Sequence, residues 1–209
     1  MSRAVLSSTE LPAYPGIALA DVRLVDSDAR CCEAFDALIA AEVIGFDTES
    51  KPTFRKGEVS TGPHLVQLAT EQHVYLFQIS QLSNVAALKE ILESRRVLKA
   101  GFGLGNDRSA LQSRLGIALD NLLDLGEVLR GPGHRGTVGA KVAVAHFFGQ
   151  KLQKSKQTST SNWAARPLSD RQLLYAANDA RVALRIYGAW KAAGSVALTE
   201  PGRNLPSGY

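Results

Sequence analysis

Two acidic residues, Asp47 and Glu49, stand directly after the short apolar run 43–46. Such a run predicts a strand covered on both faces, and residues two apart on a strand point to the same side, roughly 6.6 Å apart along the chain. Two like charges at the edge of a dry core cost free energy unless a cation or a shared proton offsets them. The pair therefore indicates cation-dependent chemistry, and two solvated acids at a strand end are the alternative.

A third carboxylate, Asp179, falls on the apolar face of the helix that we expect near the end of the chain. Its neighbours three and four residues away include Tyr175 and Val182, whereas the polar stripe of this helix runs through other positions. Tyr175 precedes Asp179 by one turn, about 6 Å along the helix axis. A carboxylate in this position is either functional or buried against an arginine or a backbone donor.

Asp107 is the fourth acid, and it follows a glycine-rich stretch that comes after a predicted strand. It falls in the first turn of the next helix, where an acid also complements the helix dipole. Gly101, Gly103 and Gly105 do not make a dinucleotide-binding fingerprint, because that motif requires a glycine at the position of Asn106.

The elements that must position these acids follow from the apolar patterns. We expect strands at 22–25, 43–47, 65–69, 74–77 and 97–100, the second to fourth of them forming an antiparallel meander. We expect helices at 28–41, 85–92, 104–115, 122–129, 138–148 and from a capping box at Ser169 and Gln172 to about residue 192. Loops are expected at 131–136 and 151–161. This order predicts a mixed α/β sheet.

The composition is that of a globular chain. It has 209 residues, 45% of them hydrophobic and 21% charged, with a formal net charge of +4. We expect an irregular N-terminal arm over 1–20, one domain over 21–195 and a C-terminal tail over 196–209. No apolar run is long enough to cross a bilayer, so no membrane association is expected. The only cysteines, Cys31 and Cys32, are adjacent, which favours a cytoplasmic location.

Taken together, the acids and their surroundings form three motifs in a fixed order. They read Ile-Gly-Phe-Asp-Thr-Glu at 44–49, Lys-Ala-Gly-Phe-Gly-Leu-Gly-Asn-Asp-Arg-Ser-Ala-Leu at 99–111, and Leu-Tyr-Ala-Ala-Asn-Asp-Ala at 174–180. The sequence resembles the DEDD superfamily of 3′–5′ exonucleases. Within it, the sequence resembles the branch with a tyrosine in the third motif, which includes ribonuclease D and the Werner-type exonuclease domain. The segment 161–168 also resembles the one that precedes the third motif in Werner-type members.

This resemblance implies a ribonuclease-H-like fold, with three antiparallel strands followed by parallel strands and flanked by helices. It implies hydrolysis of phosphodiester bonds from the 3′ end, with release of nucleoside 5′-monophosphates, and two Mg²⁺ or Mn²⁺ ions per site. By similarity, Asp47 bridges both ions, Glu49 and Asp179 complete the site of the attacking water, and Asp107 supports the second ion. Tyr175 orients the attacking water, since a phenol with a pKa near 10 is a poor base at neutral pH. The four histidines, at 64, 73, 134 and 146, have no zinc-like spacing.

Nucleic acid with a free 3′ end is the expected partner. Residues 151–171 carry five basic side chains and one acid, 5 − 1 = +4, equal to the excess of the whole chain. We take Lys99, Lys154, Trp163 and Arg166 as candidate nucleic-acid-binding residues. A solvated loop is the alternative for the lysines, and for Trp163 packing beneath the loop is favoured over stacking on a base.

Two other functions stay open at this point. A catalytically inactive ribonuclease-H-like module would bind nucleic acid or a protein without cleaving, but such a module has no physical reason to tolerate the acidic cluster. An endonuclease on the same fold is disfavoured by the tyrosine one turn before Asp179. The sequence leaves open whether DNA or RNA is the substrate and whether the chain forms a homo-oligomer.

Overall fold

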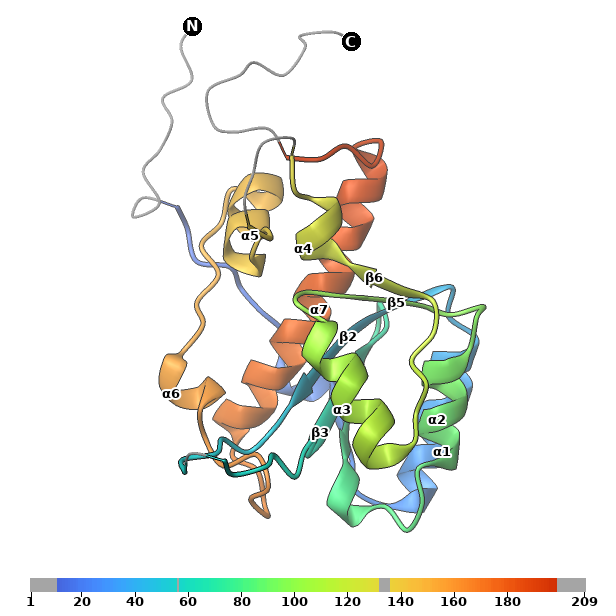
Figure 1. Ribbon diagram of the computed structural model, residues 1–209. Helices are drawn as coiled ribbons and strands as arrows, with labels where there is room; N and C mark the ends of the chain where they lie inside the picture. The colour runs from blue at the N-terminus through green and yellow to red at the C-terminus, as the bar shows by residue number, and fades with distance from the viewer. Residues whose placement is uncertain (1–10, 56, 132–135, 199–209) are drawn as a thin grey trace, which may run out of the picture.

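The computed structural model describes residues 11–55, 57–131 and 136–198, which form one sheet with helices on both faces (Figure 1). The strands are β1 (Val22–Val25), β2 (Val43–Glu49), β3 (Leu65–Ala69), β4 (Val74–Gln78), β5 (Leu98–Gly101) and β6 (Leu122–Asp124). The helices are α1 (Asp28–Ile39), α2 (Ala86–Glu93), α3 (Gly105–Leu115), α4 (Leu125–Val128), α5 (Ala140–Phe148), α6 (Lys156–Ser159) and α7 (Asp170–Ala192). Two 3₁₀ turns, η1 (Leu19–Asp21) and η2 (Ile79–Gln81), complete the set.

The six strands lie in the order β1-β4-β3-β2-β5-β6. Strands β2, β3 and β4 are antiparallel neighbours, whereas β1 pairs in parallel with β4, β5 with β2, and β6 with β5. The predicted meander and the mixed sheet are therefore confirmed. Since β2 and β5 are parallel, their carboxyl ends meet at one edge of the sheet, and both acidic motifs that follow these strands are brought to that edge.

Alternation along β2 divides its side chains between two cores. Ile44 and Phe46 are fully buried in the core that α1, α2 and α3 cover. The intervening positions, Gly45, Asp47 and Glu49, face α7 on the other side of the sheet. The strand runs two residues further than predicted, so both acids belong to its paired part, where Asp47 lies opposite Gln67 of β3.

Helix α7 packs across β2, on the face of the sheet toward which Gly45, Asp47 and Glu49 point. Its 23 residues begin at the predicted capping box, in which Ser169 accepts a hydrogen bond from the Gln172 backbone and the Gln172 side chain accepts one from the Ser169 backbone. Although α7 is the longest helix in the described part of the chain, neither it nor any other helix there is both long and apolar enough to cross a membrane.

Two of the expected elements are wrong. The helix expected at 122–129 is instead strand β6 followed by the single turn α4, which begins because the Asp124 side chain accepts a hydrogen bond from the Gly126 backbone (2.9 Å). A short apolar run does not distinguish strand from helix by periodicity, which explains the error. The loop expected at 151–161 contains the one-turn helix α6, capped by Ser155. Residues 132–135 of the other expected loop lie outside the described residues.

The described part of the N-terminal arm is fastened to the body of the protein. Ala13 forms a parallel bridge with Lys151, and the Tyr14 backbone donates to the Lys151 carbonyl (3.0 Å). Further along, the Ile17 backbone donates to the Asn178 side chain on α7 (2.9 Å). The arm therefore fixes the segment between α5 and α6; its first ten residues, and 199–209 of the tail, lie outside the described residues.

Strand β2 approaches helix α7 closely at Gly45. A Cβ atom there would lie 1.9 Å from the Ala180 carbonyl oxygen, which is backbone and cannot swing aside. Only a residue without a side chain lets β2 approach α7 this closely.

We expect the substitution Gly45→Ala to lower the free energy of unfolding by about 3 kcal/mol, the upper part of the usual range for overpacking, because β2 and α7 must separate. Chemical denaturation followed by circular dichroism measures this. Gly188→Ala, in α7 with open space around it, is the matched control and should stabilise by up to about 1 kcal/mol. Equal stability of the two variants would contradict the close approach.

Candidate active site

Asp47 and Glu49 project from the end of β2 into a partly buried space beneath α7. Burial and the neighbouring charges of Asp179 and Asp107 raise the pKa of Asp47 well above its usual value. The pKa of Glu49 rises from 4.5 to about 9, first through burial and then through repulsion by Asp47 and Asp179. These mutual effects require that acids from separate elements lie close together, as the three motifs predict.

Asp179 lies opposite them on α7 and is only 8% exposed. Its carboxylate forms an ion pair with the Lys154 ammonium, at 2.9 Å between Oδ1 and Nζ. Burial raises the pKa of Asp179, while Lys154 and a hydrogen bond from Tyr175 act in the opposite direction. Burial acts to lower the pKa of Lys154, but attraction to Asp179, Asp47 and Glu49 outweighs it, so this pKa is raised. Lys154 is therefore the cation that this cluster already contains.

Tyr175 stands one turn before Asp179, held between an aromatic ring and a cation. Its ring centroid is 5.9 Å from that of Trp163 and 5.8 Å from the Lys154 ammonium. Burial, followed by the charges of Asp179 and Glu49, raises the pKa of the Tyr175 hydroxyl. The hydroxyl therefore stays protonated at neutral pH, where it acts as a hydrogen-bond donor and acceptor and not as a base.

Asp107 reaches the same edge of the sheet from the opposite layer, in the first turn of α3. The Thr48 hydroxyl, which points away from α7, donates a hydrogen bond to the Asp107 carboxylate. Burial raises the pKa of Asp107, and this hydrogen bond lowers it in part. Thr48 thus joins β2 to α3 between the two acids of the first motif.

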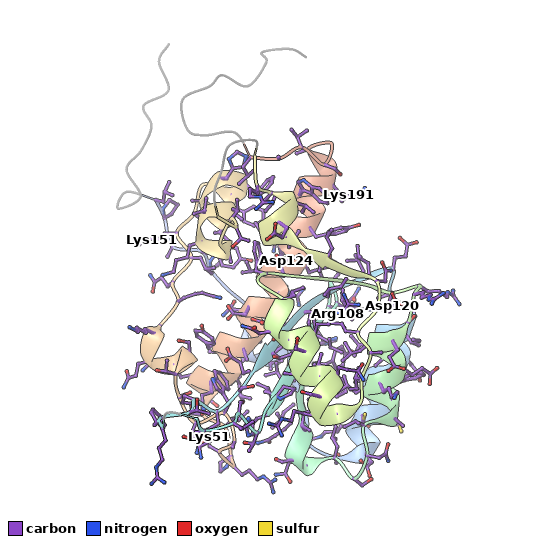
Figure 2. The ribbon with its side chains drawn as sticks, in the orientation of Figure 1. Lys51, Arg108, Asp120, Asp124, Lys151 and Lys191 are labelled. Carbon is purple, nitrogen blue, oxygen red and sulfur yellow. The ribbon has the colours of Figure 1, made fainter. Side chains whose placement is uncertain are left out.

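Asp124, which was not among the residues predicted from the sequence, fixes the turn before α3. Its carboxylate accepts hydrogen bonds from the backbones of Gly103 (3.2 Å) and Leu104 (2.9 Å), and its position is labelled in Figure 2. The signal that identified Asp47, an acid directly after a short apolar run, is also present at Asp124. It was obscured because that run was interpreted as part of a helix.

The donor set fits hard divalent cations in its chemistry. All four acids offer carboxylate oxygens, and burial raises the pKa of each, so a cation among them removes an energetic penalty. Within the described residues, no three acidic, histidine or cysteine side chains are arranged as ligands about one point. The Lys154 ammonium is paired directly with Asp179.

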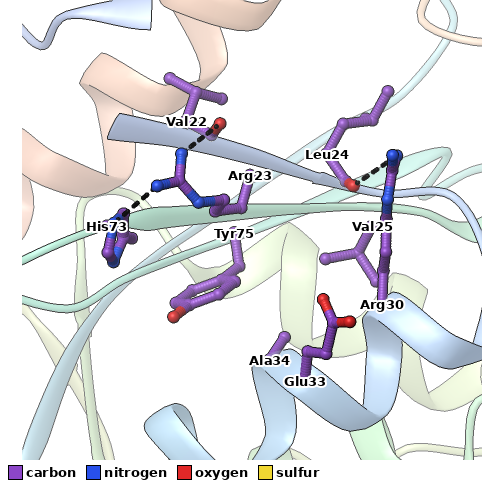
Figure 3. A pocket seen from close by; sticks show the side chains of 9 residues that line it. All are labelled: Val22, Arg23, Leu24, Val25, Arg30, Glu33, Ala34, His73 and Tyr75. Carbon is purple, nitrogen blue, oxygen red and sulfur yellow. Dashed lines mark hydrogen bonds between the residues drawn. The ribbon is translucent and has the colours of Figure 1, made fainter. Parts of the chain in front are cut away.

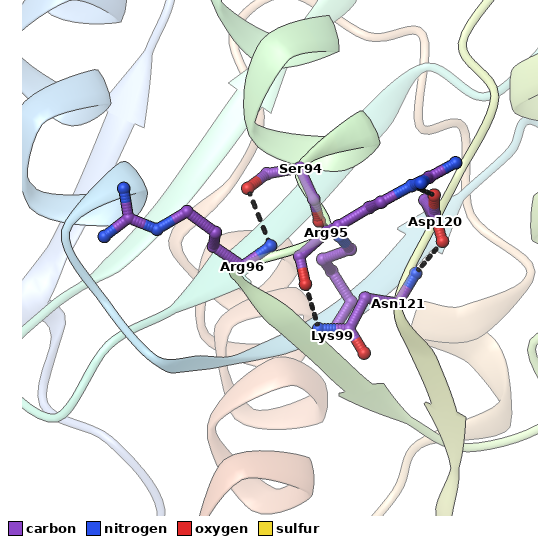
Figure 4. Close-up of polar contacts among 6 residues, drawn as sticks. All are labelled: Ser94, Arg95, Arg96, Lys99, Asp120 and Asn121. Carbon is purple, nitrogen blue, oxygen red and sulfur yellow. Dashed lines mark hydrogen bonds and ion pairs between the residues drawn. The ribbon is translucent and has the colours of Figure 1, made fainter.

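Burial contradicts a nucleic-acid contact for Lys99 and agrees with the packing role favoured for Trp163. Lys99 is fully buried, and its ammonium donates to the Ser94 carbonyl (2.7 Å) at the end of β5 away from the acids (Figure 4). Burial lowers its pKa from 10.5 to about 8. Trp163 is also fully buried, and its indole N–H donates to the Ser159 carbonyl (3.1 Å). Neither side chain presents a surface to a ligand.

The other two candidates reach the surface near the acidic edge. Lys154 is partly exposed beside Asp179, as described above. Arg166 is exposed, and its guanidinium donates to the Ser80 hydroxyl and carbonyl (3.1 and 2.9 Å) just beyond β4. A nucleic-acid contact for either residue stays a prediction.

A separate hollow of about 360 Å³ lies along the edge strand β1, remote from the acids (Figure 3). Its basic side chains are already engaged within the protein. Arg23 contacts His73 (2.9 Å) and the Val22 carbonyl (3.3 Å), and Arg30 pairs with Asp26 (2.8 Å). This hollow is therefore a poor site for a phosphate.

The raised pKa of Glu49 makes the stability of the metal-free protein depend on pH. A carboxyl group with a higher pKa in the folded state favours folding below its unfolded pKa, 4.5, and this contribution is lost as the pH rises toward about 9. In EDTA, the free energy of unfolding should therefore fall less steeply with rising pH in Glu49→Gln than in the original chain. The two slopes can differ by at most about 1.4 kcal/mol per pH unit, the value for one proton. Denaturation between about pH 5 and 8 measures the two slopes, and identical slopes would contradict the placement of Glu49.

Comparisons with known proteins agree with this arrangement. Residues 22–192 match the model of a family described as 3′-5′ exonuclease. The chain is 33% identical over 171 residues to the bifunctional 3′-5′ exonuclease/ATP-dependent helicase WRN of Mus musculus, covering 79% of this chain and 12% of that protein. It is 36% identical over 193 residues to the exonuclease mut-7 homolog of Aedes aegypti, covering 80% of this chain and 26% of that protein. The chain thus spans 12% and 26% of the length of these relatives.

Among solved structures, the Aedes aegypti Nibbler EXO domain has a TM-score of 0.70 at 30% identity, over 87% of this chain and 93% of that domain. The expected ribonuclease-H-like architecture is thereby confirmed. Because the matched segment contains every strand of the sheet together with α7, this chain belongs to the 3′-5′ exonuclease family.

Proposed function

We propose that this chain is itself an active, metal-dependent exonuclease of the tyrosine-containing DEDD branch. It would hydrolyse nucleic acid from the 3′ end and release nucleoside 5′-monophosphates. The observation that carries this proposal is the convergence of four acids from β2, α3 and α7 on one edge of the sheet, where burial raises the pKa of each. Selection for stability alone does not favour such a cluster.

The acids would hold the ions that the resemblance implies. Asp47, Glu49 and Asp179 face one another between β2 and α7, and Asp107 approaches from α3. Two bound divalent ions supply Lewis-acid activation of the phosphodiester and of water. Since Lys154 pairs with Asp179, a bound ion would compete with its ammonium for the same carboxylate, and Lys154 would then be free to contact a phosphate.

Tyr175 supports assignment to the tyrosine branch. Its raised pKa leaves a protonated hydroxyl beside Asp179, suited to hold and orient a water molecule by hydrogen bonding. The ring is fixed by Trp163, whose own indole is anchored to the Ser159 carbonyl. Trp163 therefore contributes to the site as packing for Tyr175 and not as a stacking surface for a base.

We expect a 5′-labelled oligonucleotide to be shortened stepwise from its 3′ end in Mg²⁺ or Mn²⁺ and to stay intact in EDTA. The isosteric variant Asp47→Asn should lose at least about 10³-fold in rate, because a neutral amide replaces the carboxylate at the centre of the cluster. Asp36→Asn, at an exposed position of α1, is the matched control and should cleave as the original chain does. Gel analysis of the ladders measures both rates, and parallel reactions with DNA and RNA assign the substrate.

An intact oligonucleotide under every metal condition would overturn the proposal and favour the inactive binding module. Cleavage that is equally fast in Asp47→Asn would show that hydrolysis occurs elsewhere or comes from a contaminant. Sedimentation of the same preparation tests the homo-oligomer, which stays a prediction.

A second substitution tests the tyrosine. Tyr175→Phe removes only the hydroxyl, so kcat should fall about 10²-fold while the increase in melting temperature caused by Mg²⁺ is retained. Tyr75→Phe, on β4 away from the acids, is the control and should retain full activity. Loss of the Mg²⁺ effect in Tyr175→Phe would mean that the hydroxyl supports the metal site and does not orient water.

A further inference from the structure

A basic groove lies beside the acidic cluster, on the side of α5 and α6. It has a volume of about 480 Å³ and is lined by Lys141 of α5, Lys151 and Lys154 of the connecting segment, and Arg171 and Tyr175 of α7, together with one leucine and three polar residues. Four of its side chains are cationic, and none of the described residues that line it is acidic. The groove is thus positively charged, whereas the adjacent cluster is formed by acids.

The groove and the acidic cluster share two residues. Lys154 and Tyr175 line the groove, and both also interact with Asp179 of the cluster. A strand whose terminal phosphodiester lies at the acids therefore has a direct path past Tyr175 into the groove. Along this path the surroundings change from carboxylates to ammonium and guanidinium groups, which attract the remaining phosphates.

Hydrogen bonds within the protein already hold two parts of the groove in place, the Arg171 side chain and the Lys151 backbone. Arg171 donates to the Ser155 hydroxyl (2.6 Å). The Lys151 backbone is bonded on both sides by the N-terminal arm, to the Pro12 carbonyl (2.8 Å) and from the Tyr14 N–H (3.0 Å). Figure 2 shows Lys151 on the segment between α5 and α6, away from the sheet. Within the described residues, Lys141, Lys151 and Arg171 form no ion pair with a carboxylate, so their charges are available.

We propose that this groove binds the phosphodiester backbone of the substrate strand on the 5′ side of the nucleotide being removed. Lys141, Lys151 and Arg171 contact phosphates, and Lys154 lies between groove and acids. Because the charged groups recognise phosphates and not base edges, binding is independent of sequence. This inference rests on the exonuclease function proposed above and specifies how the strand is held.

The test measures binding of the full chain to a 5′-fluorescein-labelled oligonucleotide of about 10 nucleotides by anisotropy, in EDTA and from roughly 50 to 200 mM KCl. Lys141→Ala, Lys151→Ala and Arg171→Ala should each weaken binding about 3- to 10-fold and reduce the slope of log K against log salt by about 0.7. Lys191→Ala removes the same charge about 30 Å along α7 and is the matched control, with unchanged affinity and slope. Melting temperatures confirm that the variants are folded.

A small substrate separates this inference from the proposed function. The p-nitrophenyl ester of thymidine 5′-monophosphate offers the reacting phosphate but no further strand, so the groove variants should hydrolyse it at the rate of the original chain in Mn²⁺. If the original chain hydrolyses the ester while the groove variants bind the oligonucleotide as tightly as it does, the groove proposal is overturned and the exonuclease proposal stands. If the original chain hydrolyses neither substrate, the exonuclease proposal itself fails.

Discussion

Helix α7 and strand β2 approach each other so closely that the Ala180 carbonyl fills the space that a side chain at Gly45 would need. Asp179 is the residue before Ala180, and Asp47 lies two residues after Gly45 on the same face of the strand. One backbone contact therefore sets the separation of two carboxylates that are far apart in the chain. A looser contact would leave each acid in its own solvated position, where the pKa shifts described above would not arise.

The same closeness has an electrostatic cost that the fold offsets only in part. Four acids meet at one edge of the sheet, and the Lys154 ammonium pairs with one of them, Asp179. Thr48 contributes a neutral hydrogen bond to Asp107, which stabilises that carboxylate without adding charge. The remaining repulsion persists in the folded protein because the core on both faces of the sheet holds the acids in place. An arrangement of this kind is characteristic of sites that trade stability for the capacity to bind cations.

Local patterns predicted most of the framework and the acidic residues. The period of the apolar residues placed Asp179 on the inner face of its helix, because that helix is long and begins with a recognisable cap. Strand β6 was not predicted because its three residues are too few to show a repeating pattern of apolar side chains. The burial of Lys99 was missed for another reason, because residues distant in the sequence close over its side chain. The pairing of Lys154 with Asp179 is likewise a tertiary contact that no spacing encodes.

The attachment of the N-terminal arm to the segment around Lys151 lies outside the sheet, and so does the basic groove. The four acids, by contrast, belong to β2 and to the helices that cover the sheet. In the proposed function, the groups that would hold the ions thus belong to the central framework, Lys141 and Lys151 of the groove are peripheral, and Lys154 and Tyr175 belong to both. Under this proposal, substitutions of Lys141 or Lys151 would change how the strand is held and leave the four acids in place, whereas a substitution of Lys154 would affect both functions. The surface that holds the strand could therefore change in evolution while the acidic cluster is retained.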